Sequence, residues 1–157
     1  MNILILFATS MGNAESLANS LADLLAAGGH SCDTANVATV PPMALVQEAR
    51  PVIFCASTWG EGDPPDDAIE FWELLQAMPD DSLGSLRFGV YALGDRNYEE
   101  FCGFGRKLDE CLAARGATRL VDRMDNDTDY EEHLHPFSQA LIRVLAHAGS
   151  YPLAAAA

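Results

Sequence analysis

Three short segments of this 157-residue chain combine hydroxyls, glycines and aromatic side chains in ways that suit ligand binding. The first is TSMGNAES, residues 9–16, which follows an almost unbroken apolar run. It carries no positive charge, and no Lys or Arg precedes Arg50. Backbone N–H groups at the start of a helix can hold a phosphate without a cation when short polar side chains help. The residues that would form such a site are Thr9, Ser10, Gly12 and Asn13.

The same loop excludes better-known phosphate and phosphoryl sites. A nucleotide-hydrolysing phosphate loop needs the lysine of its GK[ST] motif, and that lysine is absent. The dinucleotide-binding GxGxxG pattern is absent as well, and no acids follow the first apolar run as a phosphoryl-accepting receiver would require. A capped turn that binds nothing would use the same residue types. This loop alone therefore leaves a binding site and a plain turn open.

The other two segments each carry one prominent aromatic residue. In STWGEGDPPDD, residues 57–67, Trp59 precedes two glycines that can take positive φ. In LGDRNYEEFCGFG, residues 93–105, Tyr98 lies at the expected start of a helix. Either aromatic residue alone could cover the core or its own helix. Together with a phosphate site, the pair predicts a flat ring held between two aromatic side chains, which describes flavin mononucleotide (FMN).

The elements that would position these segments alternate along the chain. Apolar runs predict strands at 2–7, 31–37, 51–57, 87–93 and 118–122. Helical spacing predicts helices from 13 to the Gly28-Gly29 stop, from 66 to near Pro79, over 98–115 and over 130–147, with an irregularity at Pro136. The second of these carries Phe71, Leu74, Leu75 and Met78 on one face. This alternation predicts an α/β fold with a doubly wound parallel sheet of five strands and helices on both faces. Ligands of such sheets bind beyond the carboxyl ends of the strands, where all three segments lie.

Length and composition predict one domain over residues 1–148, followed by a patternless tail at 149–157 that we expect to be disordered. The N-terminus has no basic region typical of a signal peptide, and no apolar stretch is long enough to cross a bilayer. The four cysteines are scattered and form no CxxC pair, which indicates reduced thiols and a cytoplasmic location.

Charge is the most unusual property of the composition. The chain has 23 acidic and 9 basic residues, for a net charge of −14. This balance argues against nucleic acid or a membrane surface as a partner. The acids cluster at 61–81 and 122–132, which favours a partner with a basic face over a simple aid to solubility. We expect two groups of acids to surround the ligand-binding edge of the sheet: Glu61, Asp63, Asp66 and Asp67, and Asp125, Asp127 and Asp129.

The three segments, in this order, resemble flavodoxins and the FMN domains of diflavin reductases, of which the sulfite reductase flavoprotein is especially similar. ATSMGNAE is similar to the family's phosphate loop, and STWGEGD is similar to its STWG and STxGEGDPP loops. The resemblance implies the flavodoxin strand order 2-1-3-4-5 and the short-chain type. Met11 stands where the family usually has threonine, so one hydroxyl is missing from the loop.

The resemblance also implies the residues that would bind FMN. The phosphate would lie against Thr9, Ser10, Met11, Gly12, Asn13 and Ala14. Trp59 and Tyr98 would flank the flavin ring. The ribityl chain and the edges of the ring would contact Ser57, Thr58, Gly60, Leu93, Gly94, Asp95, Phe101 and Cys102.

The function that this resemblance implies is transfer of single electrons, with no catalytic residue in the chain itself. The expected partners are basic redox proteins: a flavodoxin reductase-like donor and a cytochrome or metalloenzyme acceptor. We expect a monomer. Alternative functions are an FMN-dependent NAD(P)H or quinone oxidoreductase, a separated FMN domain of a diflavin reductase, and an accessory protein that binds no flavin.

Two further candidates are weaker. His133 and His135 lie two residues apart near a helix start and do not share a helical face, so we expect solvated side chains and no metal site. Cys102 has no histidine near it in sequence, which favours a position in the core or at the ring edge over a nucleophilic role.

Overall fold

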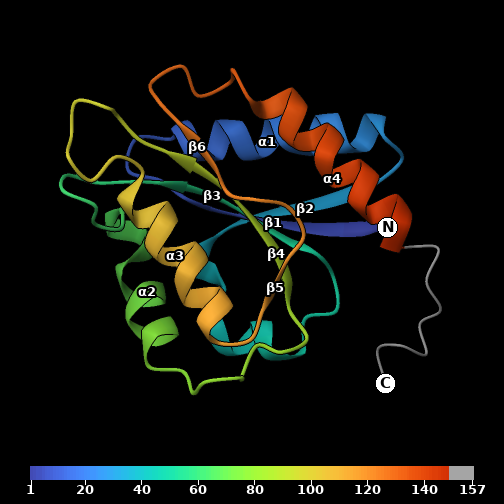
Figure 1. Cartoon of the computed structure of the whole chain (residues 1–157), viewed down its shortest axis with the longest axis horizontal. Coiled ribbons are helices and arrows are strands. Elements are labelled where there is room, and N and C mark those ends of the chain that lie inside the picture. The colour runs from blue at the N-terminus through green and yellow to red at the C-terminus, as the bar shows by residue number, and fades with distance from the viewer. Residues whose placement is uncertain (149–157) are drawn as a thin grey trace.

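A twisted parallel sheet lies at the centre of the protein, as the computed structural model shows for residues 1–148 (Figure 1). The expected tail at 149–157 lies outside the described residues. The strands are ordered β2-β1-β3-β4-β5, and a further short strand, β6, also pairs with β4. This is the expected doubly wound fold with the strand order 2-1-3-4-5.

The bounds of the elements agree with the predicted alternation. The strands are β1 (Asn2–Ala8), β2 (Ser31–Asn36), β3 (Val52–Ser57), β4 (Arg87–Leu93), β5 (Thr118–Arg119) and β6 (Met124–Asn126). The helices are α1 (Asn13–Ala27), α2 (Ile69–Gln76), α3 (Gly103–Ala114) and α4 (Leu134–Ala148). Within residues 1–148 there are also short 3₁₀ helices: η1 (Val37–Thr39), η2 (Pro42–Gln47) and η3 (Asp66–Ala68).

The apolar run of β1 is buried because helices cover both faces of the sheet. Alternate side chains of a strand point to opposite faces. Ile3 and Ile5 therefore pack on the face covered by α1 and α4, whereas Leu4 and Leu6 pack on the face covered by α2 and α3 (Figure 1). This two-sided core holds the carboxyl ends of β1, β3 and β4 side by side, which positions the loops that follow them.

Four predicted details are wrong. Helix α3 begins at Gly103, so Tyr98 lies in a turn before the helix. The fifth strand is split, because β5 and β6 pair with different parts of β4 and a bend separates them. Leu74 is 48% exposed, so it does not share the buried face of Phe71, Leu75 and Met78. Helix α4 begins at Leu134, so Pro136 lies in its first turn, where a missing N–H leaves no helical hydrogen bond unmade.

Among residues 1–148, no helix combines the length and the apolar character that crossing a membrane requires.

Candidate functional site

A pocket of about 320 Å³ opens at the carboxyl edge of the sheet, where the three predicted segments meet. Its volume lies within the range of small-molecule sites, about 300–1,000 Å³. Its walls come from the loops after β1, β3, β4 and β6. The lining residues are Ser10, Met11, Asn13, Ser57, Thr58, Trp59, Gly60, Leu93, Gly94, Asp95, Tyr98, Glu100, Cys102 and Tyr130.

The loop after β1 ends in an uncapped helix N-terminus. Gly12 precedes α1 with φ of 87°, a left-handed conformation that glycine adopts at little cost. No side chain accepts a hydrogen bond from the first turn of α1. The N–H groups of that turn also lack partners within the helix, so they are available to an anion. This supports the predicted phosphate site, in which backbone donors take the place of a cation.

Thr9 organises this loop from outside the pocket lining. Its Oγ1 accepts the Gly12 N–H at 2.8 Å, which closes the turn. Its own N–H donates to the Asp67 carboxylate, with 3.3 Å to each oxygen, and the same carboxylate accepts the Asn36 amide at 2.7 Å. Asp67 therefore ties the loop after β1 to η3 and β2. It is a structural residue of the site, although we expected it to be one of the free rim acids.

Trp59 is held at the pocket by a small antiparallel bridge. The N–H groups of Trp59 and Asp63 each donate to the other's carbonyl at 2.8 Å, which closes a turn over residues 59–63. We call it the 59–63 turn. Gly60 takes φ of 51° within it, and a Cβ at this position would meet no atom within 4 Å. The Trp59 side chain is 55% exposed, so its ring faces open space at the edge of the pocket.

The loop after β4 brings Tyr98 and Cys102 to a further wall of the pocket. The Asp95 carboxylate accepts the Asn97 N–H at 2.9 Å, and this turn presents Tyr98 with 49% exposure. Gly94 packs against the backbone of Cys102, since a Cβ on Gly94 would lie 2.7 Å from the Cys102 nitrogen. Burial raises the pKa of the Cys102 thiol to about 12, helped by the charge of Asp125. Cys102 is therefore a neutral wall of the pocket and no nucleophile.

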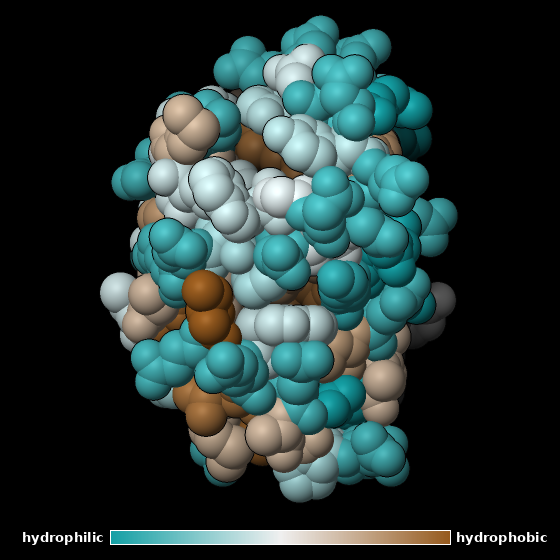
Figure 2. Space-filling view, turned by 90° about the vertical axis from the view of Figure 1, so that its left-hand side faces the viewer, coloured by the Kyte–Doolittle hydropathy of each residue, from teal (hydrophilic) through white to brown (hydrophobic). Residues whose placement is uncertain are grey.

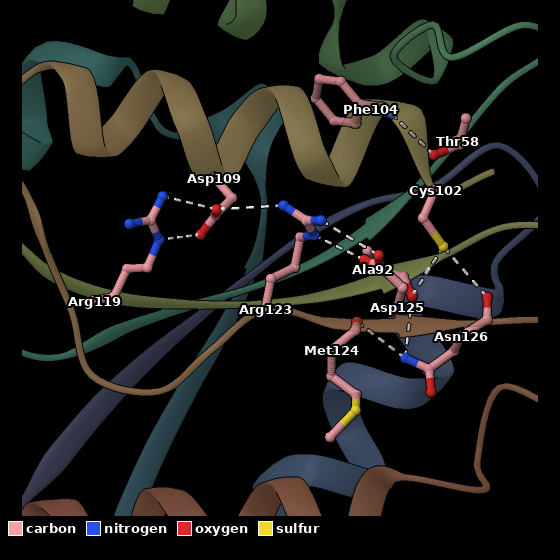
Figure 3. A network of polar contacts seen from close by, with 10 residues as sticks. All are labelled: Thr58, Ala92, Cys102, Phe104, Asp109, Arg119, Arg123, Met124, Asp125 and Asn126. Atoms are coloured by element: carbon pink, nitrogen blue, oxygen red, sulfur yellow. Dashed lines mark hydrogen bonds and ion pairs between the residues drawn. The ribbon is translucent and has the colours of Figure 1, made fainter. Parts of the chain in front are cut away.

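Asn126 connects this wall to β6 (Figure 3). Its side-chain amide donates to the carbonyls of Ala92 and Met124, and its backbone carbonyl accepts the N–H of Gly94 at 2.9 Å. Its side-chain oxygen lies 2.9 Å from Nδ1 of His133. The expectation that His133 is simply solvated is wrong, because it is half-buried and oriented by Asn126. His135 is exposed, and residues 1–148 hold no group of three or more side chains arranged to bind a metal.

Sequence reasoning missed two pocket residues, Glu100 and Tyr130. Tyr130 follows β6, and its backbone carbonyl accepts a hydrogen bond from the buried hydroxyl of Tyr91. Burial raises the pKa of Tyr130, with the charge of Asp95 adding to it. The predicted residues that do not line the pocket are Thr9, Gly12, Ala14 and Phe101. Phe101 instead lies under the Arg96 guanidinium, 4.8 Å from its ring centre.

The acids that the sequence predicts around the pocket do not line it, and they fall into two groups with different surroundings. We call the first group the turn acids: Glu61 and Asp63 in the 59–63 turn, and Asp66 in η3 just after it. They are exposed and make no ion pair within the described part of the chain. The loop acids are Asp125, Asp127 and Asp129. Two of them are paired, Asp125 with Arg123 at 2.8 Å and Asp127 with Arg96 at 3.5 Å. Figure 2 shows this edge of the molecule as mainly hydrophilic around a hollow.

Comparison with known proteins identifies the family. The sequence model for flavodoxin matches residues 5–137, most of the described sheet and helices. The chain belongs to the flavodoxin family. The flavodoxin of Streptococcus pneumoniae TIGR4 superimposes with a TM-score of 0.77 at 27% identity, over 91% of this chain and 99% of that one. Flavodoxin 1 from Bacillus cereus has the same fold, with a TM-score of 0.73 at 22% identity over 91% and 98% of the two chains.

Other relatives of this chain are much longer proteins. The sulfite reductase [NADPH] flavoprotein alpha-component of Aliivibrio fischeri is 41% identical over 127 residues, which are 81% of this chain and 21% of the relative. The same component from Bacillus subtilis is 33% identical over 147 residues, 94% of this chain and 24% of the relative. This flavodoxin-like chain thus spans about a quarter of the length of these relatives or less.

The residues present fit the family's cofactor, FMN. An uncapped helix N-terminus suits a phosphate, and two exposed aromatic side chains, Trp59 and Tyr98, line the same pocket. Gly60 and Gly94 line the same pocket without a side chain. FMN, the cofactor predicted from the sequence, is therefore also the cofactor of the family and fits this pocket.

Proposed function

We propose that this chain is an electron carrier that holds one FMN at the carboxyl edge of its sheet and exchanges electrons with partner proteins. FMN supplies the oxidation and reduction chemistry when it is bound. The observation that carries the proposal is one pocket that combines an uncapped helix N-terminus with two exposed aromatic side chains. No residue of the pocket is proposed to act as a catalyst.

The chain's own residues would bind and orient the cofactor. The first turn of α1 would donate N–H groups to the phosphate, with Ser10 and Asn13 beside it. Trp59 and Tyr98 would stack on the ring, and Leu93, Gly94 and Cys102 would exclude water from its inner edge. The unpaired turn acids add negative potential at the mouth of the pocket, which disfavours further negative charge there. This supports a carrier with a low reduction potential.

The partners are proposed from the same charge distribution. A basic face on the donor or the acceptor would be attracted to the turn acids at the pocket mouth. A reductase resembling flavodoxin reductase as donor, and a cytochrome or metalloenzyme as acceptor, have the required chemistry. A cytoplasmic monomer remains our prediction, and the free state of all four cysteines supports a reducing compartment.

The match to sulfite reductase flavoproteins favours a second candidate function. The chain could serve as the FMN module of a larger reductase, because it matches only 21–24% of those proteins. NADPH added to the purified chain under anaerobic conditions should leave its absorbance unchanged in both cases. Direct reduction by NADPH alone would instead favour a self-sufficient oxidoreductase.

The proposal is tested by titrating the chain with FMN and with riboflavin. Riboflavin lacks the phosphate and should bind at least about tenfold more weakly, since hydrogen bonds to a charged group contribute about 1.5–3 kcal/mol. We expect stacking on Trp59 and Tyr98 to quench the fluorescence of bound FMN. Trp59→Ala and Tyr98→Ala should each weaken FMN binding by about 1–3 kcal/mol and restore part of that fluorescence. Leu74→Ala, which removes exposed apolar surface on α2, is the control. Equal affinity for the two flavins would reject the phosphate site.

A further inference from the structure

The 59–63 turn rests on the beginning of α3, and two hydrogen bonds join them. Just before the turn, Oγ1 of Thr58 accepts the N–H of Phe104 at 3.2 Å (Figure 3). Near its end, the carbonyl of Gly62 accepts a hydrogen bond from Nζ of Lys107 at 3.0 Å. The turn is therefore attached to α3 at both ends, by one backbone donor and one side-chain donor.

The contact between the turn and the helix is close enough to exclude side chains. A Cβ on Gly103 would lie 2.8 Å from Cα of Gly62, and a Cβ on Gly62 would lie 3.0 Å from Cβ of Glu100. Gly62 is buried although it belongs to a surface turn. The backbones thus touch here, and the carbonyl of Gly62 has Lys107 as its donor.

Lys107 is well suited to hold this carbonyl in place. It is the single lysine of the chain and is half-buried on α3. A hydrogen bond from an ammonium group is stronger than one between neutral groups. The bond acts on the peptide that joins Gly62 to Asp63. Two residues earlier, Gly60 has a positive φ of 51°, and a glycine there leaves the turn free to take another peptide orientation.

We propose that Lys107 is a positioning residue for the flavin: by holding the Gly62 carbonyl, it keeps Trp59 and Gly60 where they line the pocket. This role rests on the proposed FMN function. Lys107 does not line the pocket itself, so it acts through the turn.

Amide hydrogen exchange of the purified full chain tests the local part of the proposal. In Lys107→Met, the N–H groups of Trp59 and Asp63 should exchange about tenfold faster, which corresponds to about 1.4 kcal/mol. Lys107→Arg keeps a charged donor and should stay near the wild type. Arg143→Met removes a cation from α4, on the other face of the sheet, and is the charge-matched control. Faster exchange that spreads to the central strands would mean general destabilisation and overturn the local role.

The rate of FMN release tests the link to binding. The Met variant should release FMN about tenfold faster than Arg143→Met, and the Arg variant should release it near the wild-type rate. Unchanged release, with or without faster exchange in the turn, overturns the positioning role. A wild-type chain that retains no FMN would reject the proposed function instead, and the exchange comparison would still decide whether Lys107 holds the turn.

Discussion

Gly94→Ala should disrupt the pocket through a contact that the structure defines closely. The new Cβ would lie 2.7 Å from the backbone nitrogen of Cys102 and 2.9 Å from its sulfur. Favourable contacts between carbon atoms lie near 3.5–4.0 Å, so one of the two segments must move by roughly 1 Å. Cys102 is fully buried and already has φ of 53°, which leaves it little freedom to move away.

The expected cost follows from overpacking a buried contact, about 1–3 kcal/mol in the free energy of unfolding. The displaced Gly94 would also strain its 2.9 Å hydrogen bond to the Asn126 carbonyl, which fixes the wall of the pocket. FMN affinity should therefore fall about tenfold or more. Urea unfolding and FMN titration of the same variant measure the two effects.

Gly84→Ala provides the matched control, because a Cβ there would lie 3.6 Å from its nearest neighbour, an ordinary contact. Its stability should stay within about 1 kcal/mol of the wild type, with unchanged FMN binding. Combining Gly94→Ala with Cys102→Ala should restore only part of the loss, since the contact with the backbone nitrogen remains. If Gly94→Ala unfolds and binds FMN like the wild type, the reasoning from this contact is refuted.

Three further predictions concern stability and charge. Asp109 is 4% exposed and accepts from Arg119 and Arg123 (Figure 3), so Asp109→Asn should lower the free energy of unfolding in urea by about 2 kcal/mol. Burial raises the pKa of Cys55 and Cys102 to about 12, so both thiols stabilise the fold as neutral groups. The free energy of unfolding should be constant below about pH 9 and should fall as the pH rises toward 12, by up to about 1.4 kcal/mol per pH unit for each thiol. Urea unfolding measured across this range checks this, and a free energy that does not change with pH would contradict it. Replacing the turn acids by amides should slow reduction of a basic cytochrome at low salt. The effect should be smaller at physiological ionic strength, where the screening length is about 8 Å. An equally slow reduction after replacement of the control acids would reject a local docking site. The control acids, exposed and away from the pocket lining, are Asp23, Asp80 and Glu110.

The sequence predicted the sheet well because burial leaves a strong pattern. β1 is apolar on both faces, and α1, which covers one of them, repeats leucines at helical spacing. The three segments were predicted to meet because parallel strands bring their carboxyl ends to one edge. These inferences needed only local patterns and the rule for connecting parallel strands.

The details that failed depend on tertiary contacts. Tyr98 was placed in a helix because the residues after it suit one, yet the carboxylate of Asp95 forms a turn and Cys102 takes a positive φ that cysteine seldom adopts. Tyr130 was missed because its place at the pocket follows from the register of β6, whose pairing with β4 has no local signal. Asp67 was expected at the rim and instead binds the backbone of Thr9, across 58 residues of sequence.

The split fifth strand has a consequence for how copies of the molecule meet. A continuous strand over 118–126 would present a row of unpaired backbone groups at the edge of the sheet, and such a row is a template for pairing with another chain. The bend between β5 and β6 leaves segments of only two and three residues. Within the bend, Arg123 turns toward Asp109 and Asp125. The bend from which Arg123 reaches the buried carboxylate of Asp109 therefore also shortens the part of this edge that could pair with another copy of the chain.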